Sequence, residues 1–152
     1  MHPHIILLHS VLRWIVLLTL VICIYRAYTG WKSGRAYTSG DNRWKLITVS
    51  VIHIQFILGV VMYFLSPIVS YFWDNFSTAV KERDVRFFAM EHMVMMTLAV
   101  VLITIGSAKA KRLTDAAAKH KTTAIWFAIG LLLIFTSIPW PFMPTPRPLF
   151  HF

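Results

Sequence analysis

The chain has 152 residues, of which 57% are hydrophobic and only 14% carry a charged side chain. A soluble globular domain carries about 25% charged residues, so this composition indicates a membrane protein and leaves room for a single domain. The formal charge of +9 lies in short patches between apolar stretches. That pattern is typical of membrane topology, and we expect no nucleic-acid partner.

Four apolar stretches follow one another along the chain, and each is close to the ~20 residues that cross a hydrocarbon core. Single segments of this length cross lipid only as helices, because a helix pairs its own backbone polar groups. The sequence therefore predicts an all-α membrane protein, a four-transmembrane-helix bundle formed by residues 1–152 as one domain. The predicted helices cover about residues 5–26, 45–66, 86–107 and 115–138.

The connections between these helices predict the orientation of the bundle. Basic residues dominate the first connection, from Arg26 to Lys45, and the third, from Lys109 to Lys121, whereas the second is balanced. By the positive-inside rule the first and third connections are cytoplasmic, so both termini lie on the non-cytoplasmic side of the membrane. The segment from Thr29 to Asn42 is rich in Gly, Ser and Thr and predicts a mobile loop.

Two further boundaries can be predicted from prolines and caps. Pro67 should end the second helix, and Asp115 or its neighbour Thr114 should cap the start of the fourth. Residues 139–152 contain repeated prolines and cannot continue a helix, so they predict an extended C-terminal tail.

One histidine belongs to each predicted helix: His9, His53, His92 and His120. An ionisable side chain at membrane depth is costly and is normally held there by a partner or a function. Two imidazoles per iron on facing helices are a means of holding haem b, so these residues predict one or two bis-histidine haems. The single Cys23, without a C-x-x-C-H motif, excludes covalent c-type haem and cysteine-ligated iron–sulfur clusters.

The depth of each histidine predicts which of them form pairs. With a rise of ~1.5 Å per residue, His9 and His92 both lie roughly 6 to 8 Å below the same boundary, which makes them ligands of one outer haem. His53 and His120 form the second predicted pair, although their nominal depths differ by ~12 Å. That pair requires the fourth helix to begin near residue 115 and to tilt toward the core.

Arg13 lies one helical turn after His9, on the same face and in apolar surroundings. It needs an anion at that depth, and a haem propionate would supply one. The alternative partner is Glu91, which precedes His92.

Several motifs of this chain are similar to those of a known family. They are His9-Ser10-x-x-Arg13-Trp14, His53-Ile54-Gln55, Arg86-Phe87-Phe88-x-x-Glu91-His92, Lys119-His120-Lys121 and Ile138-Pro139-Trp140-Pro141-Phe142. Together they resemble a family of small bacterial membrane proteins commonly labelled cytochrome b, and the likeness spans nearly the whole chain. The resemblance implies a haem protein of the bacterial inner (cytoplasmic) membrane.

We therefore expect a b-type cytochrome that carries electrons within or across the membrane, with quinol or quinone, or a protein redox partner, as its reactant. Whether it is an oxidoreductase by itself or an electron-transfer subunit stays open, as does its homo- or hetero-oligomeric state. Two other classes also stay open. A proton or metal-ion pathway could run along His9, Glu91, His92 and His53, or the chain could be a structural or assembly subunit of a larger membrane complex.

Overall fold

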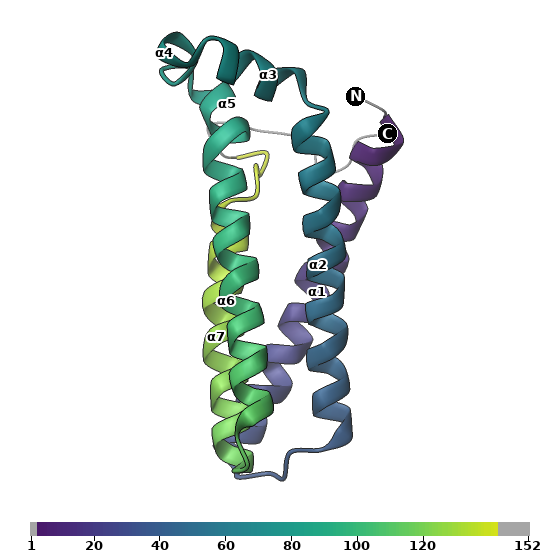
Figure 1. The fold of residues 1–152 in the computed structure, drawn as a ribbon. Coiled ribbons are helices and arrows are strands. Elements are labelled where there is room, and N and C mark those ends of the chain that lie inside the picture. The colour runs from purple at the N-terminus through teal and green to yellow at the C-terminus, as the bar shows by residue number, and fades with distance from the viewer. Residues whose placement is uncertain (1–2, 143–152) are drawn as a thin grey trace.

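Four long helices pack side by side as a bundle, and three short helices lie across one of its ends (Figure 1). The computed structural model describes residues 3–142. Four segments are long and apolar enough to cross a bilayer, namely 3–33, 39–64, 83–112 and 116–136, which confirms the all-α, multi-pass prediction. The elements are α1 (Pro3–Ser33), α2 (Ser39–Phe64), α3 (Pro67–Asp74), α4 (Phe76–Ala79), α5 (Arg83–Arg86), the π-helical η1 (Phe87–Glu91), α6 (His92–Arg112) and α7 (Ala116–Thr136).

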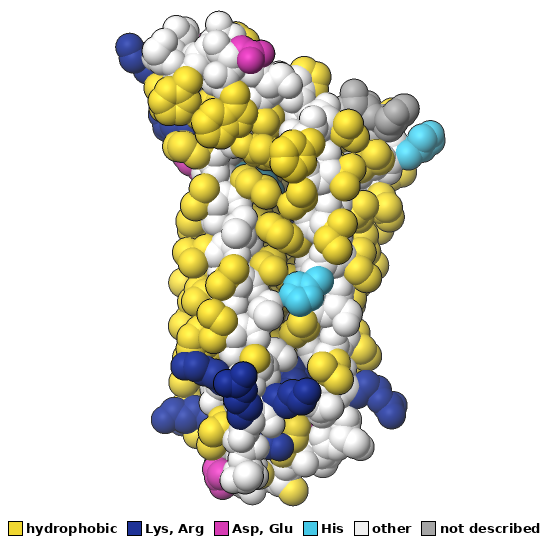
Figure 2. Space-filling view, in the orientation of Figure 1, with side chains coloured by type: hydrophobic (Ala, Val, Ile, Leu, Met, Phe, Trp, Pro, Cys, Tyr) yellow, Lys and Arg dark blue, Asp and Glu magenta, His cyan; other side chains and the backbone are white. Residues whose placement is uncertain are grey.

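The two ends of the bundle differ in chemistry. The connections 34–38 and 113–115 lie at one end, which we call the basic end because lysine and arginine side chains gather around it (Figure 2). The opposite end carries α3, α4 and α5, and we call it the capped end. Helix α1 runs obliquely across the bundle, beside α2 at the capped end and close to α7 at the basic end (Figure 1).

The first connection is much shorter than expected, because both of its helices extend into it. Gly34 has a φ of +65°, a left-handed conformation that suits glycine. The Gly34 amide donates to the carbonyl of Trp31 and the Arg35 amide to that of Gly30, which is the Schellman ending of a helix. Helix α2 then begins with a capping box between Thr38 and Asp41. The loop predicted over 29–42 is therefore only residues 34–38, and both helices are longer than the 5–26 and 45–66 predicted.

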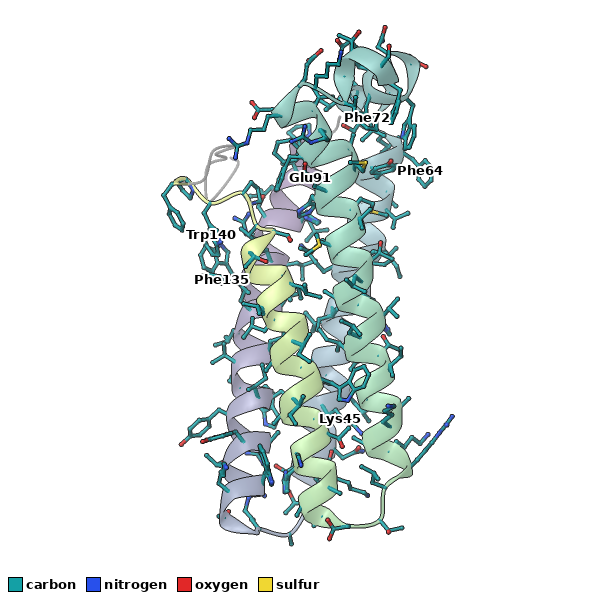
Figure 3. The ribbon with its side chains drawn as sticks, turned by 90° about the vertical axis from the view of Figure 1, so that its left-hand side faces the viewer. Lys45, Phe64, Phe72, Glu91, Phe135 and Trp140 are labelled. Atoms are coloured by element: carbon teal, nitrogen blue, oxygen red, sulfur yellow. The ribbon has the colours of Figure 1, made fainter. Side chains whose placement is uncertain are left out.

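Helix α7 begins where the sequence predicted, directly after the cap residue Asp115. The Asp115 side chain accepts a hydrogen bond of 2.7 Å from the Ala118 amide and so caps the start of α7 at Ala116. The helix ends at Thr136. The chain then folds back, and Trp140 Nε1 donates to the carbonyl of Phe135 at 2.9 Å (Figure 3). Residues 141–142 form a turn. The rest of the predicted extended tail, 143–152, lies outside the described residues.

The capped end is built from aromatic side chains. Pro67 occupies the first turn of α3, as expected for a proline that ends one helix and starts another. Phe72 of α3 is fully buried, and its ring packs edge-on against those of Trp73 and Phe76 (Figure 3). Trp73 stacks on Phe76, and both are exposed, which suits the interface between lipid and water.

The interior of the bundle is narrow, and apolar side chains cover much of its outside (Figure 2). Leu20, Ile103 and Phe127 are fully buried between the helices, whereas Leu18 and Leu132 are 60% and 62% exposed. Exposed leucines along the middle of long helices are costly in water and favourable in lipid. The fold is that of a multi-pass membrane protein.

Candidate functional site

A partly open cavity of about 250 Å³ lies near the capped end and is lined by residues of α1, α2, α3, η1, α6 and α7. It is mostly apolar, with a few polar groups that converge on it, as in small-molecule sites. The lining residues with polar side chains are His9, Ser10, Arg13, Gln55, Tyr63, Ser66 and His92. The structure thus brings three of the five predicted site residues, His9, Arg13 and His92, to one cavity.

His92 has a fixed tautomer. Its Nδ1 lies 2.8 Å from the backbone carbonyl oxygen of Ser137, just beyond the end of α7. A carbonyl oxygen can only accept a hydrogen bond, so Nδ1 carries the proton and the neutral ring keeps its lone pair on Nε2. Histidines that bind metals usually donate their other ring N–H to a carbonyl or carboxylate in this way.

His9 reaches the cavity from α1. Its Nδ1 is buried and has no hydrogen-bond partner among residues 3–142. The ring lies against α2 at Gly59, where an added Cβ would be 3.5 Å from the His9 Cε1. Gln55 secures the same stretch of α1, because its Nε2 donates to the His9 carbonyl at 3.0 Å. A buried, unpartnered ring nitrogen costs free energy unless it finds a ligand or donor.

Arg13 lines the same cavity one turn below His9, with its Cζ 5.6 Å from the centre of the Trp14 ring. The alternative partner that the sequence suggested for Arg13 is Glu91, which contacts Arg86. The Glu91 carboxylate accepts a hydrogen bond of 2.6 Å from Arg86 Nε. Figure 3 shows Glu91 near the capped end of the bundle.

His53 lies elsewhere, between α2 and α6. Its Nε2 is 2.9 Å from the hydroxyl oxygen of Thr104 on α6. That hydroxyl already donates to the Val100 carbonyl at 2.7 Å, so it can accept from His53. This contact gives the histidine a polar partner at membrane depth without any cofactor.

His120 lies at the basic end and is fully buried, and neither of its ring nitrogens has a partner in the described part of the chain. The ring is pressed against α1 at Gly30, where any Cβ would meet it at 2.5–2.7 Å. The Tyr37 ring lies 5.0 Å away, and burial raises the pKa of Tyr37 to about 12, so its hydroxyl stays protonated. The adjoining cavity measures about 10 Å³, room for about one water molecule.

The second predicted pair is therefore not brought together. α2 and α7 both begin at the basic end, and His53 is fourteen residues into α2 whereas His120 is four residues into α7. With ~1.5 Å per residue their heights differ by roughly 15 Å. The shared site of His53 and His120 gains no support from this geometry and stays a prediction.

Two structural features of the site were not predicted from the sequence. The π-helical η1 comes directly before His92, and π-helical turns inside α-helices often occur at functional sites because they redirect side chains. The Ser137 carbonyl comes from 45 residues further along the chain. Neither depends on a recognisable motif, although Pro139, which ends α7 nearby, hinted that backbone carbonyls would be free there.

The donor set of the cavity fits haem better than a bare metal ion. Among residues 3–142, no three His, Cys, Asp or Glu side chains cluster to hold an ion, so a metal here would have two imidazoles and would need further ligands. A macrocycle supplies four nitrogens of its own. It also needs more room than 250 Å³, and the flexible side chains of Met62, Met93 and Met96 are the walls that can move.

No protein-family model matches the chain, and neither a curated protein nor a solved structure matches it. The likeness to proteins labelled cytochrome b therefore stays a prediction from motifs. The structure itself establishes a four-helix protein with four candidate membrane spans.

Proposed function

We propose that the protein is a b-type haem membrane protein that carries electrons, with one haem held in the cavity at the capped end by His9 and His92. The observation that supports this most is the hydrogen bond from His92 Nδ1 to the Ser137 carbonyl, which keeps a ring-nitrogen lone pair available on a residue that lines the cavity. The unpartnered Nδ1 of His9 at the same cavity adds a second imidazole.

Three polar residues of the cavity, His9, Arg13 and His92, have a role in this proposal. Bound haem supplies reversible one-electron chemistry at its iron. His9 and His92 would hold the iron, and the Ser137 carbonyl would orient the His92 ring and raise its basicity. Arg13 offsets the negative charge of a propionate. The His9 ring lies beside α2 at Gly59, where an added Cβ would be in ordinary van der Waals contact with it.

The proposal holds one haem rather than two. The sequence favoured a second site at His53 and His120, but among residues 3–142 the two histidines have separate surroundings and different heights along the bundle. We assign His53 to the contact with Thr104 and His120 to the packing of α7 on Gly30.

The position of the cavity along the bundle suggests which molecules could exchange electrons with the haem. By the positive-inside rule the basic end faces the cytoplasm of a bacterial inner membrane, and both termini lie outside. The haem then lies near the non-cytoplasmic surface, where quinol in that leaflet or a protein redox partner can reach it. Either would exchange single electrons with the iron.

The spectrum of the purified protein tests the proposal. Protein expressed with a haem supply should be red, should show the reduced-minus-oxidised bands of low-spin b-type haem, and should contain about one haem per chain by extraction. A colourless protein that is monodisperse and stable, and that also fails to take up added haemin, would contradict it. The structural or assembly role would then become the better account.

A second candidate function rests on the methionines. Met93 and Met96 line the cavity beside His9 and His92, and thioethers with imidazoles are a ligand set that favours Cu(I). Metal analysis of the same preparation separates the two functions. Stoichiometric copper without haem would favour a copper site, whereas iron in a ratio of one to haem favours the cytochrome.

A further inference from the structure

Two lysines from different helices each contact the same aromatic ring at the basic end. Lys32 lies in the last turn of α1 and Lys121 near the start of α7. Their ammonium nitrogens are 4.5 Å and 5.5 Å from the centre of the Trp31 indole. Both side chains are exposed. The ring therefore holds two positive charges within about 10 Å of each other.

These two charges have no acidic partner in the described structure. The ion pairs among residues 3–142 join Arg26 and Arg35 to Asp41, and Arg86 to Glu91. Two ammonium groups at this separation repel each other, and the repulsion grows near lipid, where the effective dielectric constant falls. An anion placed between them is attracted by both.

Apolar side chains continue from each lysine toward the middle of the bundle. They recur every three or four residues, so each row occupies one face of its helix. α1 and α7 pack against each other, and the two rows run along neighbouring helices. The exposed members are Leu18, Val21 and Tyr25 on α1, and Ile125, Ile129 and Leu132 on α7.

We propose that this place binds one anionic phospholipid. Lys32 and Lys121 hold its phosphate, Trp31 lies at the level of the headgroup, and the acyl chains extend along the two apolar rows. A phosphodiester supplies the missing negative charge, and its attached chains match the apolar surface that begins directly beyond the lysines. A soluble anion would use only the first of these features. The site is independent of the haem proposal, because no residue is shared between them.

Lipid retention measured by native mass spectrometry tests the site. Wild type, the double variant Lys32→Gln/Lys121→Gln and the control Lys109→Gln/Lys111→Gln are released from nanodiscs of phosphatidylglycerol or phosphatidylcholine. The control loses the same charge at the same end, and Lys109 also lies over an indole, 4.7 Å from the Trp126 ring, without a second lysine there. The double variant should retain about tenfold less phosphatidylglycerol, and the control should lose less than about twofold.

Three results would overturn the proposal. An equal loss in the double variant and its control would mean a diffuse basic surface. Equal retention of phosphatidylglycerol and phosphatidylcholine by the wild type would mean that charge plays no part. Displacement of the lipid by millimolar inorganic phosphate would mean a site for a free anion. Lys32→Arg/Lys121→Arg keeps both charges and should retain the lipid, so that a loss caused by misfolding is recognised.

Discussion

A single backbone contact determines the chemistry available to His92. The Ser137 carbonyl fixes the proton on Nδ1, and the lone pair is left on the other nitrogen. The sequence predicted His9, Arg13 and His92 as site residues and predicted the pairing of the two histidines by depth. The carbonyl could not be predicted, because its position depends on how the chain folds back after α7.

At the same scale, we predict that Arg13 sets the potential of the proposed haem. Arg13→Leu should keep the low-spin spectrum and lower the midpoint potential by on the order of tens of millivolts, because a nearby positive charge favours the reduced form. Arg13→Lys keeps the charge and serves as the control in a spectroelectrochemical titration. An unchanged potential in a haem-loaded Leu variant would mean that Arg13 has a structural role.

Gly30 should tolerate no side chain. A Cβ there would lie 2.5–2.7 Å from three atoms of the buried His120 ring, so Gly30→Ala should destabilise the protein by about 1–3 kcal/mol. Gly40→Ala is the matched control, since its Cβ would lie at least 3.4 Å from its neighbours and alanine favours a helix. Thermal unfolding in detergent compares them, and equal melting temperatures would refute the packing argument.

At the scale of elements, the caps explain why helix existence was predictable and helix length was not. Apolar stretches predicted four helices, and Asp115 predicted the start of α7. α1 and α2 continue through polar residues, because the Schellman ending at Gly34 and the capping box at Thr38 stabilise polar turns that hydropathy does not detect. The signal was in the sequence as Gly34 and the pair Thr38 and Asp41.

Asp41 should matter more than an ordinary helix cap. Its side chain is only 4% exposed and pairs with Arg26 at 2.9 Å and Arg35 at 2.7 Å, besides closing the capping box. Asp41→Ala should destabilise the protein by about 2 kcal/mol or more, because two arginines lose their partner. The two arginine side chains are partly exposed, and water limits the loss. Asp115→Ala, which removes only a cap, should cost about 1 kcal/mol. Equal shifts in melting temperature for both variants would contradict this ranking.

At the scale of the whole molecule, the oblique course of α1 decides which histidines meet. It places His9 at the cavity with His92 near one end and Gly30 against His120 near the other. A sequence predicts the height of a residue along its helix but not the crossing of that helix over its neighbours. The four-helix bundle and the difference in height between His53 and His120 were therefore predictable, whereas the close approach of α1 at Gly30 to His120 was not.

The orientation in the membrane is a prediction of the same scale. A fluorescent reporter that matures only in the cytoplasm, fused after Phe152, should give no signal, because the basic end is expected to face the cytoplasm. Thr114→Cys, in a variant whose Cys23 is replaced, should not react with a membrane-impermeant thiol reagent in intact cells. It should react once the membrane is permeabilised and the cytoplasmic face becomes accessible. A bright fusion together with labelling of intact cells would reverse the topology.

The haem content of four single variants tests the central account most directly. His9→Ala and His92→Ala should each remove the same low-spin haem spectrum, and the double variant should lose nothing further, because both residues act on one site. His53→Ala and His120→Ala should keep about one haem per chain, provided that each remains monodisperse. If His53→Ala and His120→Ala each remove a haem while His9→Ala and His92→Ala do not, the iron is not bound in the cavity at the capped end.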